Sequence, residues 1–394
     1  PYRVDLSLNM VLLLLLTAFA VSYAALRAFS ALVMLPQHAK RWRQQQKERQ
    51  MYQAFVASFS HLQAGRYLRA RKSAQQLLKL SDELRAEHAN VPQDTSLRAI
   101  AHMFAADSAH ALRDMAARDM HYRQALESAP ANGTPQQREV LEGAQMRAAR
   151  WALDDRNPQE AMDRLAQLSA GAARRTMALR IHLKASRLAN HTQSALDTTR
   201  LLAKHGGITP EAAASMSRSL ILEQLQQTHD ADQLLRTWSA LPAHERQMPD
   251  IALTAAQKLV QADGNSALAR TWLLPVWEQF VQTPAALTNA QAERLLLTLQ
   301  QALEGLDGDW LARIEAAQRA TPQDARLQYL AGMACMQRQL WGKAEQLLQT
   351  AAGRLSEKAL RASAWKALAI LAEQREDSAG ASHAWRQAAL ANTL

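Results

Sequence analysis

Four histidines stand close together in the chain, and they are the residues most able to bind a haem or a metal. His102 and His110 are eight residues apart, about two helical turns, so they can share a face; His121 would lie on the partner helix, and His88 precedes them. Because imidazole nitrogens ligate iron, His102, His110 and His121 are candidate haem ligands. Histidines that are exposed or packed between helices are the favoured alternative, so no resident cofactor is predicted.

Motifs for catalysis or nucleotide binding are missing from the sequence. Gly342-Lys343 lacks the upstream glycine and the following Ser or Thr of a phosphate-binding loop, and His244-Glu245 lacks the second histidine of a zinc-protease helix. No GxSxG or GxGxxG occurs. The single cysteine, Cys335, excludes an internal disulfide and a cysteine-based zinc site. We therefore predict no enzyme activity, no catalytic residue and no metal site.

The net charge of +10 is concentrated in one segment. Residues 36–80 hold ten basic residues against one acid, Glu48. Basic residues just after an apolar segment are typical of a cytoplasmic membrane flank and can bind anionic lipid. Nucleic-acid binding is not predicted, because no stacking aromatics alternate with these charges. The candidate membrane-surface patch comprises Lys40, Arg41, Arg43, Arg66, Arg69, Arg71 and Lys72.

The apolar segment itself covers about residues 6–26 and carries no charge over 21 residues. That length suffices to cross a hydrocarbon core of about 30 Å. A cleaved signal peptide would carry its basic residues before the apolar run, and a buried core helix would not need Leu12–Leu16 unbroken. A transmembrane helix is the favoured interpretation, with the body in the cytoplasm. Because the chain starts at Pro1, we expect further residues upstream, and these could include another membrane helix.

The body is predicted to be a helical repeat. Ala, Leu, Gln and Arg dominate, aromatic residues make up only 5%, and long β-branched runs are absent, so the fold class is all-α. Small residues recur at the 34-residue spacing of tetratricopeptide repeats, as from Ala161 to Ala195. An Ala/Leu-rich bundle is the alternative, but it would not need that recurrence. The expected repeat-packing residues are Gly332, Ala344, Ala351, Trp365, Ala369 and Ala381.

Taken together, these patterns predict a transmembrane helix followed by a right-handed tetratricopeptide-like solenoid of about nine helical pairs. We expect residues 1–35 to form the N-terminal segment and 36–130 the basic juxtamembrane region with the first repeats. Residues 131–290 would form degenerate repeats and 291–394 clearer ones. Such a stack offers a long groove to a partner helix or peptide.

The order of these features resembles the bacterial HemY family. The resemblance is strongest in YRVDLSLNMVLLLLLTAFAVSYAALRAF, in KRWRQQQKERQ and in HLQAGRYLRARKSAQQLL. It implies a bacterial inner-membrane protein with a cytoplasmic repeat domain that organises or regulates protohaem-synthesis enzymes. The flavin-dependent porphyrinogen oxidase of the same name is a different protein, and no dinucleotide-binding glycine motif supports that activity here.

Three functional hypotheses follow. The first is a membrane-anchored scaffold for haem-synthesis enzymes, with membrane lipid and those enzymes as partners. The second is a haem- or porphyrin-binding carrier or sensor, based on the histidines. The third is a membrane-tethered assembly platform unrelated to haem. Architecture alone does not choose among them, because helical repeats bind unrelated ligands on one fold.

Overall fold

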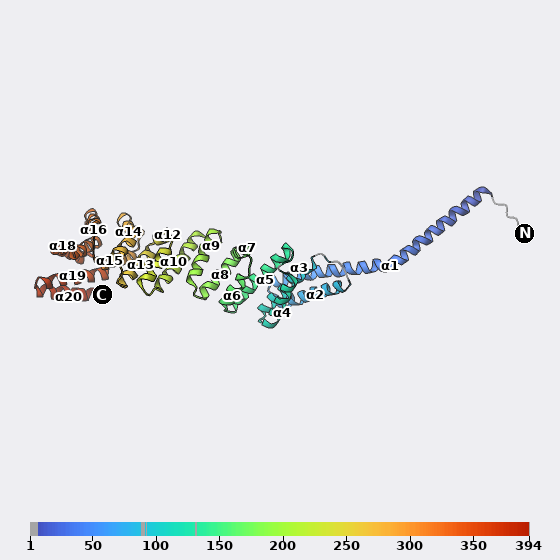
Figure 1. The fold of residues 1–394 in the computed structure, drawn as a ribbon, viewed down its shortest axis with the longest axis horizontal. Helices are drawn as coiled ribbons and strands as arrows, with labels where there is room; N and C mark the ends of the chain where they lie inside the picture. Colours follow the sequence, from blue (N-terminus) through green and yellow to red (C-terminus); the bar gives the residue numbers. More distant parts are fainter. Residues whose placement is uncertain (1–6, 88–90, 92, 131, 394) are drawn as a thin grey trace. The chain divides into compact units, whose positions relative to one another are not determined.

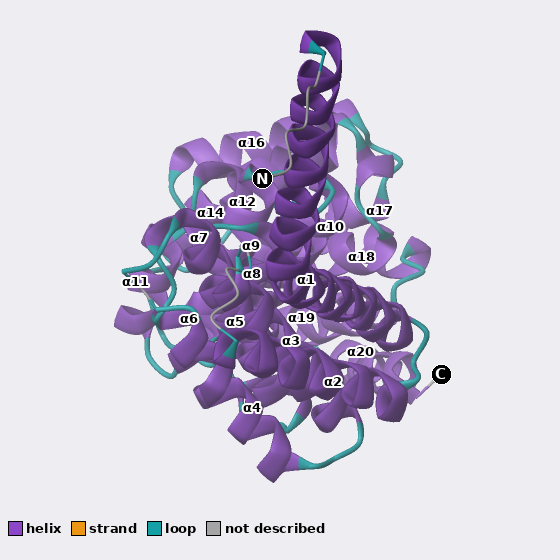
Figure 2. Cartoon of the chain, turned by 90° about the vertical axis from the view of Figure 1, so that its right-hand side faces the viewer, coloured by secondary structure: helices purple, strands orange, loops and turns teal. Residues whose placement is uncertain are grey.

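The computed structural model describes residues 7–87, 91, 93–130 and 132–393, and for residues 31–38, 392 and 393 it describes the backbone only. All regular structure in these residues is helical (Figure 2). The chain divides into two compact units, Pro1–Ala185 (unit 1) and Ser186–Leu394 (unit 2), and the boundary falls within helix α8. The all-α prediction is therefore confirmed, whereas this boundary was not expected from the sequence.

Unit 1 contains the helices α1 (Leu8–Gln63), α2 (Tyr67–Ala86), α3 (Asp94–Ala111), α4 (Met115–Ser128), α5 (Pro135–Asp154), α6 (Pro158–Ala166), α7 (Ala170–Ala173) and most of α8 (Thr176–Leu188). Helices α1 and α2, α3 and α4, and α5 and α6 pack as consecutive pairs. The first helices of these pairs also contact one another, α1 with α3 and α3 with α5. This is the connectivity of a stacked helical repeat.

Unit 2 contains α9 (Thr192–Lys204), α10 (Pro210–Gln226), α11 (Ala231–Ala240), α12 (Ala243–Arg246), α13 (Pro249–Gln261), α14 (Ser266–Gln282), the 3₁₀ helix η1 (Pro284–Ala286), α15 (Asn289–Gln301), α16 (Gly308–Ala320), α17 (Ala325–Gln337), α18 (Trp341–Arg354), α19 (Lys358–Gln374) and α20 (Ser378–Thr393). Here too the first helices follow one another, since α13 contacts α15, α15 contacts α17, and α17 contacts α19. Helices α9 and α10, α13 and α14, α17 and α18, and α19 and α20 pack as consecutive pairs.

Local sequence fixes where the helices begin and end. Thr134 accepts a hydrogen bond from the Gln137 amide while Gln137 bonds back to the Thr134 amide, and Pro135 occupies the first helical position. Such a capping box stabilises a helix start by about 1 kcal/mol. At the C-terminal end of a helix, Gly65 follows α1 with φ +69°, a left-handed conformation that glycine adopts without strain.

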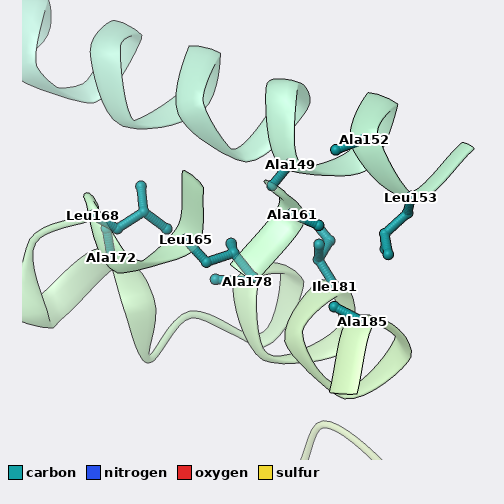
Figure 3. Packing of buried hydrophobic residues seen from close by; sticks show 10 residues of the cluster. All are labelled: Ala149, Ala152, Leu153, Ala161, Leu165, Leu168, Ala172, Ala178, Ile181 and Ala185. Carbon is teal, nitrogen blue, oxygen red and sulfur yellow. The ribbon is translucent and has the colours of Figure 1, made fainter. Parts of the chain in front are cut away.

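Small residues let the helices of a pair cross closely. One core cluster joins α5, α6, α7 and α8, and six of its ten members are alanines (Figure 3). In unit 2, a Cβ added at Gly332 would lie 2.7 Å from Cγ of Leu348, so α17 and α18 approach each other at this position. Fully buried Ala344 and Ala351 lie on the same side of α18.

Helix α1 has two parts with opposite surroundings. Residues Leu8–Ser30 are long and apolar enough to cross a membrane, and none of this stretch is buried. Its large apolar side chains are 41–78% exposed. The C-terminal part of the same helix packs on α2 and α3, while the N-terminal part stands clear of them (Figure 1). Met51 and Ala54 of the C-terminal part are buried in a core with Leu77 of α2.

Candidate functional site: a groove in unit 1

A groove of about 490 Å³ opens between the first helices of successive pairs in unit 1. Its walls come from the end of α1, the start of α2, and helices α3, α5 and α8. This follows from the stacking, because the first helices line one face of the repeat. The lining residues are Leu62, Gln63, Tyr67, Asp107, His110, Ala111, Gly143, Met146, Arg147, Arg150, Trp151, Asp154, Met177 and Ile181.

The floor of the groove is apolar and rigid. The buried Trp151 ring stacks on the His110 ring at 5.7 Å between centroids and meets the Tyr122 ring edge-on at 5.9 Å. The Arg118 guanidinium lies over the Trp151 ring, 5.8 Å from its centroid. These contacts fix the tryptophan before any ligand arrives, which lowers the entropy cost of binding. Met177 on α8 is 54% exposed and supplies an adaptable apolar contact.

Each acidic side chain at the rim of the groove lies beside a basic side chain, but one arginine has no acidic partner. Arg147 forms an ion pair with Asp107, and His110 Nε2 lies 3.5 Å from a carboxylate oxygen of Asp154. Arg150 also lines the groove, is exposed, and has no ion-pair partner among the described residues. An apolar floor with one uncompensated guanidinium suits a ligand that has an apolar side chain and a carboxylate.

Two of the three candidate histidines come together, but not the two expected to share a face. His102 Nδ1 and His121 Nδ1 are 3.2 Å apart and both side chains are buried between α3 and α4. Burial, with the neighbouring His121 second, lowers the pKa of His102 to about 4, and burial also lowers the pKa of His121. His110 points instead to the groove, because eight residues advance a helix by about 80° beyond two full turns.

Helix α1 separates the candidate basic patch into two groups. Lys40, Arg41 and Arg43 follow the apolar stretch, whereas Arg66, Arg69, Arg71 and Lys72 lie in or beside the α1–α2 turn. Arg71 bonds to Asp114 at 2.8 Å. The two groups therefore do not form one continuous patch along α1.

The remaining candidate positions lie in unit 2. Ala369 and Ala381 are buried where α19 and α20 pack together, and Trp365 meets His383 edge-on at 5.9 Å. The Cys335 thiol is buried, and burial raises its pKa, which disfavours the thiolate. Within the described residues, no group of three or more His, Cys, Asp or Glu side chains could hold a metal ion.

Apart from His110, the groove residues were not singled out from the sequence. Arg147, Arg150 and Trp151 lie within one turn of α5, a pattern equally typical of a solvated helix face with one buried position. These side chains form part of one surface only because α3, α5 and α8 stack against one another.

Solved structures with related architecture are distant from this chain. A structure of Naa15/Naa10 bound to HypK-THB is 12% identical and has a TM-score of 0.26; the match covers 83% of this chain and 57% of that one. The TPR domain of P58(IPK) is 12% identical over 83% of this chain and 99% of that one, with a TM-score of 0.22. A circular tandem repeat protein is 16% identical and has a TM-score of 0.15; the match covers 88% of this chain and 82% of that one.

These TM-scores are too low to support an argument about binding, so the fold rests on the helix pairing described above. Among curated proteins, none matches the chain. The N-terminal region gives a family match: residues 1–113 fit the family model described as the HemY protein N-terminus. That range includes the apolar stretch, all of α1 and α2, and α3, which contributes His110 to the groove. The resemblance is thus confirmed for residues 1–113, which match this family model.

Proposed function

We propose that this protein is a non-enzymatic, membrane-anchored scaffold that binds other proteins through the unit 1 groove. The observation that carries the proposal is the groove itself, which has a preorganised aromatic floor and an uncompensated arginine on a stacked helical repeat. The exposed apolar stretch Leu8–Ser30 supports the anchor, because such a surface in water would be strongly unfavourable.

The partners in this proposal are enzymes of haem synthesis, and the membrane is the bacterial inner membrane. The HemY N-terminal match supports the pathway. The basic residues after the span support a cytoplasmic body, since Lys and Arg accumulate on the cytoplasmic side of a membrane helix. A partner segment would place an apolar side chain against Trp151 and a carboxylate on Arg150.

Site-directed photo-crosslinking tests the groove. A photoreactive amino acid replaces Met177, which lines the groove, and in a separate variant it replaces Met120, which lies on the outer helix α4 and is 42% exposed. Both positions are exposed methionines of unit 1, so the two variants differ mainly in whether the photoreactive group lies in the groove. After irradiation of cells, the adducts are purified from detergent-solubilised membranes and identified by mass spectrometry.

A haem-synthesis enzyme crosslinked at position 177 and absent at position 120 supports the proposal. Adducts to an unrelated partner at position 177 would support a general assembly platform instead. Equal adducts at both positions, or none at position 177, would refute the groove as the binding site. Accumulation of porphyrins in a deletion strain provides an independent measure of the pathway.

The histidine geometry does not favour the alternative of a haem carrier. A haem iron with two histidine ligands lies between their nitrogens, with the porphyrin ring in the plane that separates them. The His102 and His121 nitrogens instead contact each other directly, at 3.2 Å. His110 is stacked on Trp151 and close to Asp154. Haem titration of the purified protein, followed by its Soret band, tests this alternative directly.

A further inference from the structure

We infer that Lys40 and Arg43 of α1 form a binding site for the phosphate of anionic phospholipid headgroups, and that the second basic group, at Arg66 and Arg69, does not contact lipid. The inference rests on the membrane anchor of the proposed function, but not on the groove or its partners. It assigns different roles to two basic groups that the sequence alone would treat as one patch.

The position of Lys40 and Arg43 along α1 places them close to the membrane surface. The apolar stretch Leu8–Ser30 spans about 34 Å as a helix, close to the thickness of a hydrocarbon core. The sequence stays apolar through Leu35, so Lys40 follows the last residue of the apolar run by about 8 Å along the helix and Arg43 by about 12 Å. Side chains on a helix lean toward its N-terminus. On α1 this direction leads back to the apolar stretch, so both cations reach toward the headgroups.

The surroundings of Lys40 and Arg43 leave room for a lipid headgroup. Both line a surface cavity of about 720 Å³ between α1 and the C-terminal end of α2. Trp42 borders the same cavity with 66% of its surface exposed, as expected of an aromatic residue at a membrane interface. Lys47 also lines it, but its charge is satisfied by Glu83 and Glu87, each at 2.8 Å. Neither Lys40 nor Arg43 forms an ion pair with a described residue, although Glu87 also lines the cavity and attracts Lys40 through space.

The second basic group is too far along the chain to share that environment. Helix α1 continues from Ser30 to Gln63, about 50 Å along its axis, before the turn that leads to Arg66 and Arg69. Charges are screened over about 8 Å at physiological salt. Arg66 and Arg69 border a different surface cavity, with Leu68 and Leu112. They therefore provide a matched control within the same chain, with the same number of charges.

The size of the effect follows from the surface potential. Each Lys or Arg near an anionic membrane contributes about 1 kcal/mol, and 1.4 kcal/mol corresponds to a tenfold change. Removing both charges of the proposed site should therefore lower the preference for anionic over zwitterionic lipid by at most about 30-fold. Removing Arg66 and Arg69 should leave the preference within about twofold of the wild type.

The experiment uses the full chain in proteoliposomes that contain spin-labelled phosphatidylglycerol or spin-labelled phosphatidylcholine. Electron paramagnetic resonance gives the association of each lipid with the protein, and their ratio is the preference. The double variants are Lys40→Ala with Arg43→Ala, and Arg66→Ala with Arg69→Ala. All four side chains are exposed, so helix content by circular dichroism should not change in either variant. Glycerol 3-phosphate is added as a competitor that lacks the acyl chains.

Loss of the preference in the Lys40/Arg43 variant alone supports the inference. Equal loss in both variants would show an unspecific effect of net charge, and no loss in either would show that lipid does not bind here; both results overturn it. Competition by millimolar glycerol 3-phosphate would show a site for free phosphate and would also overturn it. Carbonate extraction reports separately on the anchor: release of the wild-type chain from membranes would refute the anchor of the proposed function, not this site alone.

Discussion

The buried Arg270 gives the sharpest prediction about stability. Its side chain is 1% exposed, and the guanidinium donates hydrogen bonds to the backbone carbonyls of Ala302, Glu304 and Gly305, just after α15. Ala302 is the C-cap of α15, Glu304 and Gly305 lie in the turn beyond it, and no backbone amide of the described residues donates to these three carbonyls. Arg270 thus holds the turn that connects α15 to α16.

The substitution Arg270→Met removes these donors and keeps most of the apolar volume. Each buried carbonyl that loses its partner costs about 1–3 kcal/mol. Part of this loss is offset, because burying the guanidinium is itself unfavourable, as the lowered pKa of Arg270 indicates. We expect a net loss of about 3–5 kcal/mol. For a unit of this size that corresponds to a fall of roughly 6–20 °C in the unfolding temperature of unit 2.

The assay is hydrogen exchange measured by mass spectrometry on the full chain in detergent, together with thermal unfolding. Peptides that cover residues 298–310 should exchange faster in the variant, before global unfolding. The control is Arg313→Met, because Arg313 is partly exposed and makes one ion pair of 3.7 Å with Glu278. It should change stability by less than about 1 kcal/mol. An unchanged exchange rate in residues 298–310 of the Arg270 variant would refute the reasoning.

Three further predictions concern packing, pH and the membrane. Gly332→Val should destabilise unit 2 by about 1–3 kcal/mol in thermal unfolding, whereas Gly353→Ala, which has open space around it, should not. The unfolded chain binds a proton at His102 near pH 6.5 and the folded chain only near pH 4, so stability should fall as the pH drops through this window. His102→Gln should reduce that fall, while the exposed His205→Gln should leave it unchanged in melts at pH 7 and pH 5. Phe19→Arg lies near the middle of the apolar stretch and should cost about 2.5–3.5 kcal/mol of membrane insertion, seen as release on carbonate extraction.

The helical repeat could be predicted because its signal is local. Close helix crossings require small residues, and Gly332 and Ala344 show this on the two helices of one pair. The apolar stretch is equally local, since length and composition are enough to recognise it. The match to the HemY N-terminus covers residues 1–113, where the sequence patterns are strongest.

The groove and the buried arginine could not be predicted, because their signals are not local. Arg270 follows Ala269 in an ordinary helical pattern, and nothing in its neighbours indicates that carbonyls about 32 residues later surround it. Likewise, His102 was expected to share a face with His110, but its partner is His121 on the next helix. In both cases the angle at which two helices cross decides the contact, and sequence spacing does not encode that angle.

The continuity of α1 has a mechanical consequence. A helix transmits both bending and twist, whereas a flexible linker transmits neither. Because α1 runs without a loop from the apolar stretch into the first repeat pair, unit 1 cannot rotate freely about its attachment. Partners held in the groove would share one height above the lipid surface and one orientation. Partner enzymes would then meet within a thin layer beside the membrane, and the orientation of each active site would be set before they meet.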